Sequence, residues 1–192
     1  MARIQPSTAF VDVSALQLEP GDRINLGVAA IIGRLPQVAE ALGSLKMALS
    51  STGTRPPRLV ELVRLRIAFH NQCRSCMSVR YQSAVDDGLT EDAVCSLERP
   101  AEAEDLSAAE RSALRFADLF ATNHLQIDDS VYDDLRRHFT EDELVELGMH
   151  CALCVGMGRL AATWAVTDDL PDAFKSPTGA APWTSEGVIA SG

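Results

Sequence analysis

ELVRLRIAFHNQCRSCMSVR, residues 61–80, joins an apolar helical pattern to two cysteines three positions apart. Two Cα atoms with that spacing in a helix lie about 5 to 6 Å from each other, a separation that a disulfide tolerates. Such a pair can cycle between dithiol and disulfide. The thiolate is the reactive form of cysteine, and its pKa falls near arginine or at a helix N-terminus. The stretch therefore predicts redox chemistry at Cys73 and Cys76.

Glu61 is the single acid between Arg55 and Arg80, a segment rich in arginine. On one unbroken helix, about 1.5 Å per residue would hold Glu61 roughly 18 Å from Cys73, too far for proton transfer. A break at residues 70–72 removes this separation, because Asn71 can end one helix in a left-handed conformation or cap the next. We therefore expect two helices that fold back on each other, with the cysteines in the first turns of the second.

Helical periodicity extends through most of the chain, and no stretch shows the sustained period-two alternation of a strand. Capping-box patterns mark helix starts at Ser107 and Thr140. The fold class is therefore all-α, with about seven or eight helices in a single domain over residues 1–174. Residues 175–192, rich in Pro, Gly, Ser and Ala, form a tail that we expect to be loosely held or to reach onto a neighbouring subunit. Predicted helices cover residues 36–49, a run that enters at 54–57 and carries apolar residues from 59 to 69, about 73–87, a short segment after 88, a run that starts at 107 and carries apolar residues to 120, 128–138 and 140–164.

Composition limits the partners and the compartment. There are 17 Lys and Arg against 27 Asp and Glu, a net charge of -10 that argues against nucleic acid and anionic membranes. The apolar stretch 148–166 is interrupted by His150, Arg159 and three glycines, so it predicts a buried helix rather than a membrane span. The first residues lack the pattern of a secretory signal. We expect a cytoplasmic protein whose five cysteines serve redox or metal chemistry rather than a disulfide framework.

Around these residues the chain resembles the AhpD-like branch of the carboxymuconolactone decarboxylase family. The family motif is Glu, eleven residues, Cys-x-x-Cys, three residues and His; Glu61, Cys73 and Cys76 match its spacing. The resemblance covers roughly residues 40–97. It implies an AhpD-like orthogonal bundle that assembles into homo-oligomers, trimers or hexamers. It also implies a cysteine peroxidase for small hydroperoxides, regenerated by an external dithiol or adaptor protein, with no cofactor and no metal.

Carried over by position, Cys76 is the peroxidatic cysteine, Cys73 the resolving cysteine and Glu61 the acid or base of a proton relay. Where the motif places its histidine, this chain has Arg80. An arginine one helical turn from Cys76 can lower the thiol pKa but cannot shuttle a proton. His70 is the nearest titratable substitute, because it lies three residues before Cys73.

Structural roles compete with these assignments. Glu61 is also suited to a first-turn acid paired with Arg64 or Arg58. The arginines as a group are suited to a solvated face or to ion pairs with the acidic C-terminal half of the chain.

The remaining cysteines are predicted to be structural. Cys151 and Cys154 form a second CxxC, but their apolar neighbours favour core packing. A zinc site built from both pairs is less favoured, because a zinc ribbon separates its pairs by about 15 to 20 residues and these lie much further apart. Cys95 stands alone and is expected to pack.

Three functions remain open from the sequence. The first is a thiol peroxidase that forms a sulfenic acid on Cys76 and then the disulfide with Cys73. The second is a carboxymuconolactone decarboxylase-like enzyme, in which the arginines hold a small carboxylate. The third is a non-enzymatic helical oligomer whose cysteines only sense the redox state.

Overall fold

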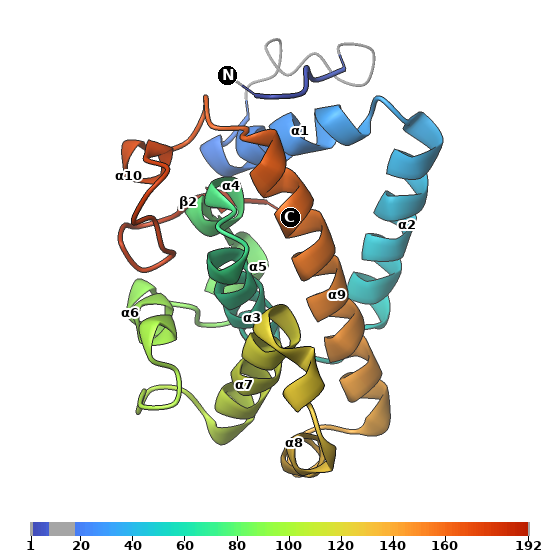
Figure 1. Cartoon of the computed structure of the whole chain (residues 1–192), viewed down its shortest axis with the longest axis vertical. Helices are drawn as coiled ribbons and strands as arrows, with labels where there is room; N and C mark the ends of the chain where they lie inside the picture. Colours follow the sequence, from blue (N-terminus) through green and yellow to red (C-terminus); the bar gives the residue numbers. More distant parts are fainter. Residues whose placement is uncertain (1, 8–17, 192) are drawn as a thin grey trace.

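The computed structural model of the chain describes residues 2–7 and 18–191, and this part is almost entirely helical (Figure 1). The all-α prediction is confirmed, with ten α-helices among the described residues and two strands of three residues each. The α-helices are α1 Pro20–Ile32, α2 Pro36–Thr52, α3 Pro57–His70, α4 Arg74–Ser78, α5 Gln82–Asp86, α6 Glu91–Cys95, α7 Ala108–Thr122, α8 Asp129–Leu135, α9 Glu141–Trp164 and α10 Asp172–Lys175. The 3₁₀ helices are η2 Ser96–Glu98 and η3 His124–Gln126, and the strands are β1 Val79–Tyr81 and β2 Val188–Ala190.

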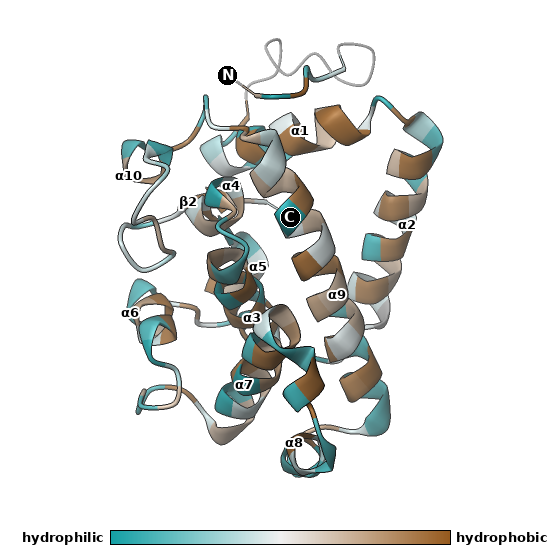
Figure 2. Ribbon diagram, in the orientation of Figure 1, coloured by the Kyte–Doolittle hydropathy of each residue, from teal (hydrophilic) through white to brown (hydrophobic). Residues whose placement is uncertain are grey.

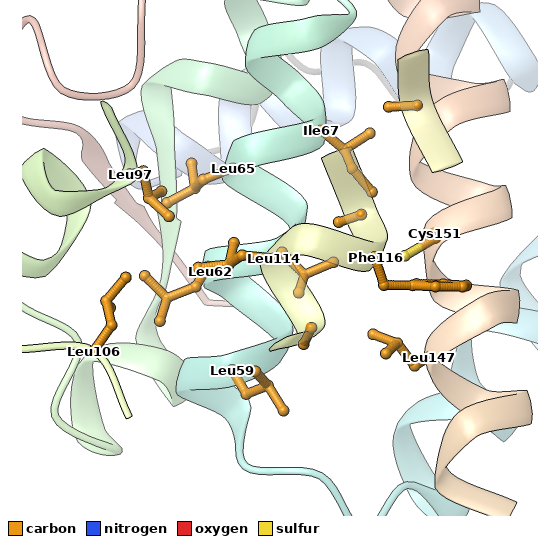
Figure 3. Packing of buried hydrophobic residues seen from close by; sticks show 14 of the residues in the cluster. Leu59, Leu62, Leu65, Ile67, Leu97, Leu106, Leu114, Phe116, Leu147 and Cys151 are labelled. Atoms are coloured by element: carbon orange, nitrogen blue, oxygen red, sulfur yellow. The ribbon is translucent and has the colours of Figure 1, made fainter. Parts of the chain in front are cut away.

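Helix α3 is the central element, in contact with both α7 and α9. Apolar side chains are buried around most of its circumference, as expected of a helix enclosed by others. Figure 3 shows Leu59, Leu62, Leu65 and Ile67 of α3 in the main core, with Phe116 of α7 nearby. Each such side chain contributes about 1.5 to 3 kcal/mol by leaving water. The core thus fixes the helix that carries Glu61.

Both predicted capping boxes are present. The Ser107 hydroxyl accepts from the Glu110 amide at 3.2 Å, and the Glu110 carboxylate accepts from the Ser107 amide at 2.7 Å. At α9, the Thr140 hydroxyl accepts from the Glu143 amide at 3.3 Å, and the return bond is 2.8 Å. Each cap stabilises its helix by about 1 kcal/mol. The sequence therefore located the starts of α7 and α9 correctly.

Helix α9 is the one described helix long and apolar enough to cross a membrane, judged by length and composition alone. Its inner side packs on α3 and α7, but only 28% of its apolar window is buried, so the helix is less buried than the sequence predicts. Its outer side exposes Val145, Met149 and Leu160. Helix α2, beside it in Figure 1, buries none of residues 36–51 and exposes Met47. Figure 2 shows hydrophobic segments along both helices. Within the described part of the chain, both helices therefore keep exposed apolar side chains.

The predicted helix over residues 73–87 is wrong in its middle, where α4, β1 and α5 follow one another. Strand β1 is extended because it pairs in parallel with β2, from the far end of the chain. The carbonyl of Val79 also accepts side-chain hydrogen bonds, from Arg64 at 2.7 Å and Arg80 at 3.2 Å. Neither partner is visible in local periodicity.

Two terminal regions also differ from the expectation. Helix α1, which buries Ile24 and Ile31, precedes the first helix that the periodicity predicts, at residues 36–49. The expectation that residues 175–192 are loosely held is wrong for 175–191. This segment returns to its own chain, pairs β2 with β1, and buries Ala180, Ala181 and Ala190.

Candidate active site

The predicted break between the two helices is confirmed. Helix α3 ends at His70, Asn71 is still right-handed, and Gln72 has φ 51° in the left-handed region. The left-handed residue is thus Gln72 rather than Asn71. Its side chain donates to the Phe69 carbonyl at 2.7 Å, which helps to hold a conformation that costs roughly 1 to 2 kcal/mol. Cys73 then caps α4, and both cysteines lie in the first turn of the new helix.

Cys73 and Cys76 form a disulfide, with their Cα atoms 5.2 Å apart. Cys73 is completely buried, whereas Cys76 is half-buried. Cys76 packs against an apolar cluster that includes Ile24 of α1 and Phe174 of α10. Attack by an external molecule on this pair is therefore directed at Cys76.

Glu61 lies close to Cys76 through one intervening side chain, Arg64. The buried Glu61 carboxylate accepts from Nε and Nη2 of Arg64, each at 2.6 Å. Nη1 of Arg64 donates to the Cys76 carbonyl at 2.7 Å, and the Tyr81 amide donates to Glu61 at 3.3 Å. The fold-back thus joins Glu61 and the cysteine backbone, and the predicted Glu61–Arg64 ion pair is part of the same arrangement.

Arg64 stays charged in this setting. Burial lowers its pKa, but the charge and the hydrogen bonds of Glu61 outweigh burial and leave the pKa above its usual range. The guanidinium also lies over the Tyr81 ring, 5.0 Å from its centroid, while burial raises the pKa of Tyr81. A permanent cation therefore stands at the Cys76 carbonyl, the kind of setting that favours a thiolate.

Arg80 does not lie one helical turn from Cys76, because it belongs to β1. Its guanidinium, 1% exposed, donates to both oxygens of Glu91 at 3.0 and 3.1 Å. It also donates to the carbonyls of Met77 and Pro182, each at 2.8 Å. In this position Arg80 fastens β1 to α6 and to the C-terminal segment.

His70 is directed toward α7 by a hydrogen bond to Asp118. Its Nε2 lies 2.7 Å from Asp118, which Arg66 also contacts at 2.6 Å. Burial alone would raise the pKa of Asp118, but hydrogen bonds from His70 and Arg66 outweigh it and lower the pKa. The structure therefore gives His70 a partner other than the disulfide.

The sequence analysis missed a neighbouring pair, His150 and Cys154 of α9. His150 Nε2 is 3.6 Å from the Cys154 sulfur and 3.2 Å from the Val60 carbonyl, next to Glu61. Burial lowers the pKa of His150 to about 4 and raises that of Cys154 to about 12, so both groups are neutral at pH 7. Their spacing of four residues, which places them on one helix face, was the available signal.

The other cysteines follow the sequence only in part. Cys151 is buried, and burial raises its pKa, as core packing requires. Cys95 is exposed, so its predicted packing is wrong. Within the described residues, no group of three or more His, Cys, Asp or Glu side chains is arranged to hold a metal ion.

Comparison with solved structures supports this fold. Two crystal structures of the debrominase Bmp8 superpose with a TM-score of 0.64 and cover 88% of this chain. The apo form has 22% sequence identity to this chain, and the superposition covers 91% of the Bmp8 chain. A cysteine-to-alanine variant in complex with 2,3,4-tribromopyrrole has 20% identity, and the superposition covers 90% of it. At this identity the likeness shows the fold alone.

Sequence comparison finds similarity over the middle part of the chain. Two uncharacterized proteins of Mycobacterium tuberculosis, MT2376 and Rv2313c, are each 40% identical over 93 residues, 47% of this chain. The match spans only 32% of each relative, about a third of its length. Residues 36–119, including the disulfide and Glu61, match the family model for carboxymuconolactone decarboxylases. Over these residues the chain is similar to the carboxymuconolactone decarboxylase family.

Proposed function

We propose that this protein is a thiol-dependent peroxidase that reduces hydroperoxides through Cys73 and Cys76. The observation that carries the proposal is the Glu61–Arg64 pair joined to the Cys76 carbonyl at 2.7 Å. It supplies a carboxylate and a permanent cation beside a cysteine pair that already forms a disulfide. The reaction needs these parts: a thiolate, a proton carrier and a second sulfur.

In the proposed cycle, the Cys76 thiolate attacks the terminal oxygen of the hydroperoxide. An S–O bond forms, the O–O bond breaks, and the departing alkoxide takes a proton to become an alcohol. Cys73 then attacks the sulfenic acid, the disulfide forms and water leaves. An external dithiol restores both thiols and is itself oxidised to a disulfide. Arg64 cannot give up a proton, so Glu61 is the group assigned to proton transfer.

The surroundings of Cys76 favour hydroperoxides with an apolar organic group. The cluster that contains Cys76 includes Ile24, Phe69, Tyr81 and Phe174. Apolar and aromatic walls bind organic ligands by removing their surface from water. We therefore expect an alkyl or aryl hydroperoxide to be turned over faster than hydrogen peroxide.

The test is hydroperoxide consumption with a dithiol reductant. We expect Cys76→Ser to abolish turnover, Cys73→Ser to stop it after one equivalent, and Glu61→Gln to slow it at least tenfold. Cys95→Ser is the matched control, because it removes an exposed thiol outside the site. Unchanged turnover in Cys76→Ser would contradict the proposal. Lactone decarboxylation of a small carboxylate that survives replacement of both cysteines would support the second function instead.

Reductive dehalogenation is a further candidate for the same cysteine pair. The structural neighbour Bmp8 is a debrominase crystallised with a tribromopyrrole, and the apolar cluster at Cys76 suits a halogenated aromatic ring. The balance is two thiols and an aryl bromide giving a disulfide, the arene and hydrogen bromide. Bromide release that depends on Cys76, without hydroperoxide consumption, would favour this activity.

We also propose that the protein is a cytoplasmic homo-oligomer. The uncovered apolar faces of α2 and α9 support assembly, since exposed apolar patches of this kind mark protein contacts. If copies meet through these faces, Met47 and Met149 become buried. The number of subunits, trimer or hexamer, follows from the family resemblance.

A further inference from the structure

The C-terminal strap, residues 175–191, forms part of the wall around Cys76. The apolar cluster that contains Cys76 takes Ala180, Val188 and Ala190 from this segment. At its start, Nη1 of Arg74, which stands between the two cysteines, donates to the Lys175 carbonyl. The strap is thus attached to the disulfide-bearing helix itself.

Further along, the strap is held at three independent places. Its strand β2 pairs with β1, with Val79 opposite Val188. The Pro182 carbonyl accepts from Arg80, the residue at the motif's histidine position, at 2.8 Å. At the strap's end the Ser191 amide and hydroxyl both donate to Asp22 of α1, at 2.8 and 2.7 Å. The strap therefore crosses from α4 to α1 beside Cys76.

The strap also contacts α3, through an aromatic side chain. The Trp183 ring of the strap packs on Phe69, with ring centroids 4.6 Å apart, and lies under the guanidinium of Arg66 at 6.0 Å. Phe69 precedes the turn that leads into Cys73. Cys73 therefore has no exposed surface, whereas part of the surface of Cys76 remains exposed.

A small dithiol and a protein dithiol differ in what they require of this surface. Disulfide exchange brings the attacking sulfur to about 2 Å from Cys76, whichever molecule carries it. A protein brings its surroundings as well: even weak redox encounters bury up to about 1,200 Å² in total. Because strap residues belong to the same apolar cluster as Cys76, we expect such a partner to meet the strap when it approaches this cysteine.

We propose that the strap determines which reductants reach the disulfide: small dithiols act on the closed form, and protein dithiols act only after the strap detaches. In either case an external thiolate attacks Cys76, the Cys73–Cys76 bond breaks, and Cys73 leaves as a thiolate that takes a proton. The second external thiol then resolves the mixed disulfide. This inference rests on the proposed redox function and adds the class of reductant.

Detachment begins most easily at the two ends of the strap, because the hydrogen bonds there lie at the surface, whereas its middle is held by Trp183, by the pairing with β1 and by the buried bond from Arg80. The bonds from Arg74 to Lys175 and from Ser191 to Asp22 are exposed. Segments with few buried apolar contacts and exposed hydrogen bonds open at a free energy well below that of global unfolding.

Two glycines provide substitutions that loosen the strap without touching a cysteine. A Cβ at Gly21 would overlap the Ile189 carbonyl, and a Cβ at Gly187 would lie 2.7 Å from the Arg80 guanidinium carbon. A Cβ at Gly43 of α2 meets nothing within 4 Å. Gly21→Ala and Gly187→Ala are the test variants, and Gly43→Ala is the matched control.

The experiment measures the rate at which the oxidised protein loses its Cys73–Cys76 disulfide, with dithiothreitol or with a thioredoxin-type protein dithiol. We expect Gly21→Ala to raise the protein-dithiol rate at least tenfold and the dithiothreitol rate less than threefold, while Gly43→Ala changes neither. Hydrogen exchange at 188–190 reports whether the strap has loosened. If Gly21→Ala does not fold, Asp22→Ala removes the surface bonds to Ser191 and is expected to act in the same direction.

Equal protein-dithiol rates in the wild type and in a variant whose strap exchanges faster would overturn the inference. So would a wild-type protein that thioredoxin reduces as fast as dithiothreitol does at equal concentration. No hydroperoxide is present in this assay, so its outcome is separate from that of the peroxidase test. If the protein consumed no hydroperoxide but its disulfide were reduced at the expected rates, only the peroxidase proposal would be contradicted.

Discussion

Replacing Arg64 is the sharpest perturbation of the site, because this side chain connects Glu61 to the disulfide turn. Arg64→Met removes both hydrogen bonds to Glu61 and those to the carbonyls of Cys76 and Val79. Glu61, 2% exposed, would keep the Tyr81 amide at 3.3 Å as its remaining donor. Removing one partner of a buried ion pair costs about 3 to 5 kcal/mol. We expect a loss of that size in the free energy of unfolding.

Arg64→Lys separates charge from geometry. The ammonium keeps the positive charge, but its three donors on one nitrogen cannot reproduce the planar fork that makes four hydrogen bonds from three nitrogens. A loss of about 2 kcal/mol is expected, from the range of about 1.5 to 3 kcal/mol for one hydrogen bond to a charged group. In the reduced protein, Arg64→Met should also move the Cys76 pKa toward that of free cysteine, about 8.5.

Guanidinium chloride unfolding of the oxidised protein measures the loss, read as a change in midpoint at constant slope. Arg99→Met is the matched control, because Arg99 is 75% exposed and its ion pair with Glu102 should contribute less than about 1 kcal/mol. The double variant with Glu61→Gln should lose at least 2 kcal/mol less than the sum of the single variants, from the coupling expected of groups in contact, up to about 3 kcal/mol. Additive losses, or an Arg64→Met loss no larger than the control, would refute this account of the site.

Three further outcomes follow from burial and exposure. Burial lowers the pKa of His150 from 6.5 to about 4, so the unfolded chain binds a proton at this residue before the folded protein does as the pH falls. The free energy of unfolding is therefore highest above pH 6.5, as far as His150 is concerned, and decreases as the pH falls toward 4. His150→Gln should remove up to about 3 kcal/mol of this pH dependence of the free energy of unfolding. The prediction would be contradicted if the wild type and the variant each unfolded identically at pH 5 and at pH 7.5. Iodoacetamide should alkylate the exposed Cys95 of the native oxidised protein first, while the buried Cys151 and the half-buried Cys154, whose pKa burial raises to about 12, should react only slowly before denaturation. Equally fast loss of all three free thiols would contradict this order. Met149→Glu should shift the protein toward monomer in size-exclusion chromatography with light scattering, whereas Leu125→Glu on η3 should not; a monomeric wild type would remove the proposed assembly.

The parts of the fold that could be predicted are those determined by neighbours in the sequence. The apolar period of α3, the capping residues Ser107 and Thr140 and the break before Cys73 all depend on contacts within a few residues. The closeness of Glu61 to the cysteines followed from the break, because a continuous helix would have separated them. Local signals were therefore sufficient for α3, for the starts of α7 and α9 and for the core of the candidate site.

The features that could not be predicted depend on partners far along the chain. Strand β1 is extended because of β2 and because carbonyls that a helix would use accept from Arg64 and Arg80. The different position of Arg80 follows from the same pairing, since a helix through residue 80 would have placed it one turn from Cys76. His150 reaches the Val60 carbonyl only through the packing of α9 on α3. No periodicity within a single segment contains this information.

The parallel pairing of β1 with β2 has a consequence for how the protein matures. Contacts between segments distant in sequence form late, since a long loop must close before they give any stability. During synthesis, α3 and α4 are complete long before the strap has been made. The nascent cysteines are then open to cellular oxidants and thiol partners, including some that the finished protein excludes. The oxidation state in which the chain first closes is therefore decided before the strap takes its place.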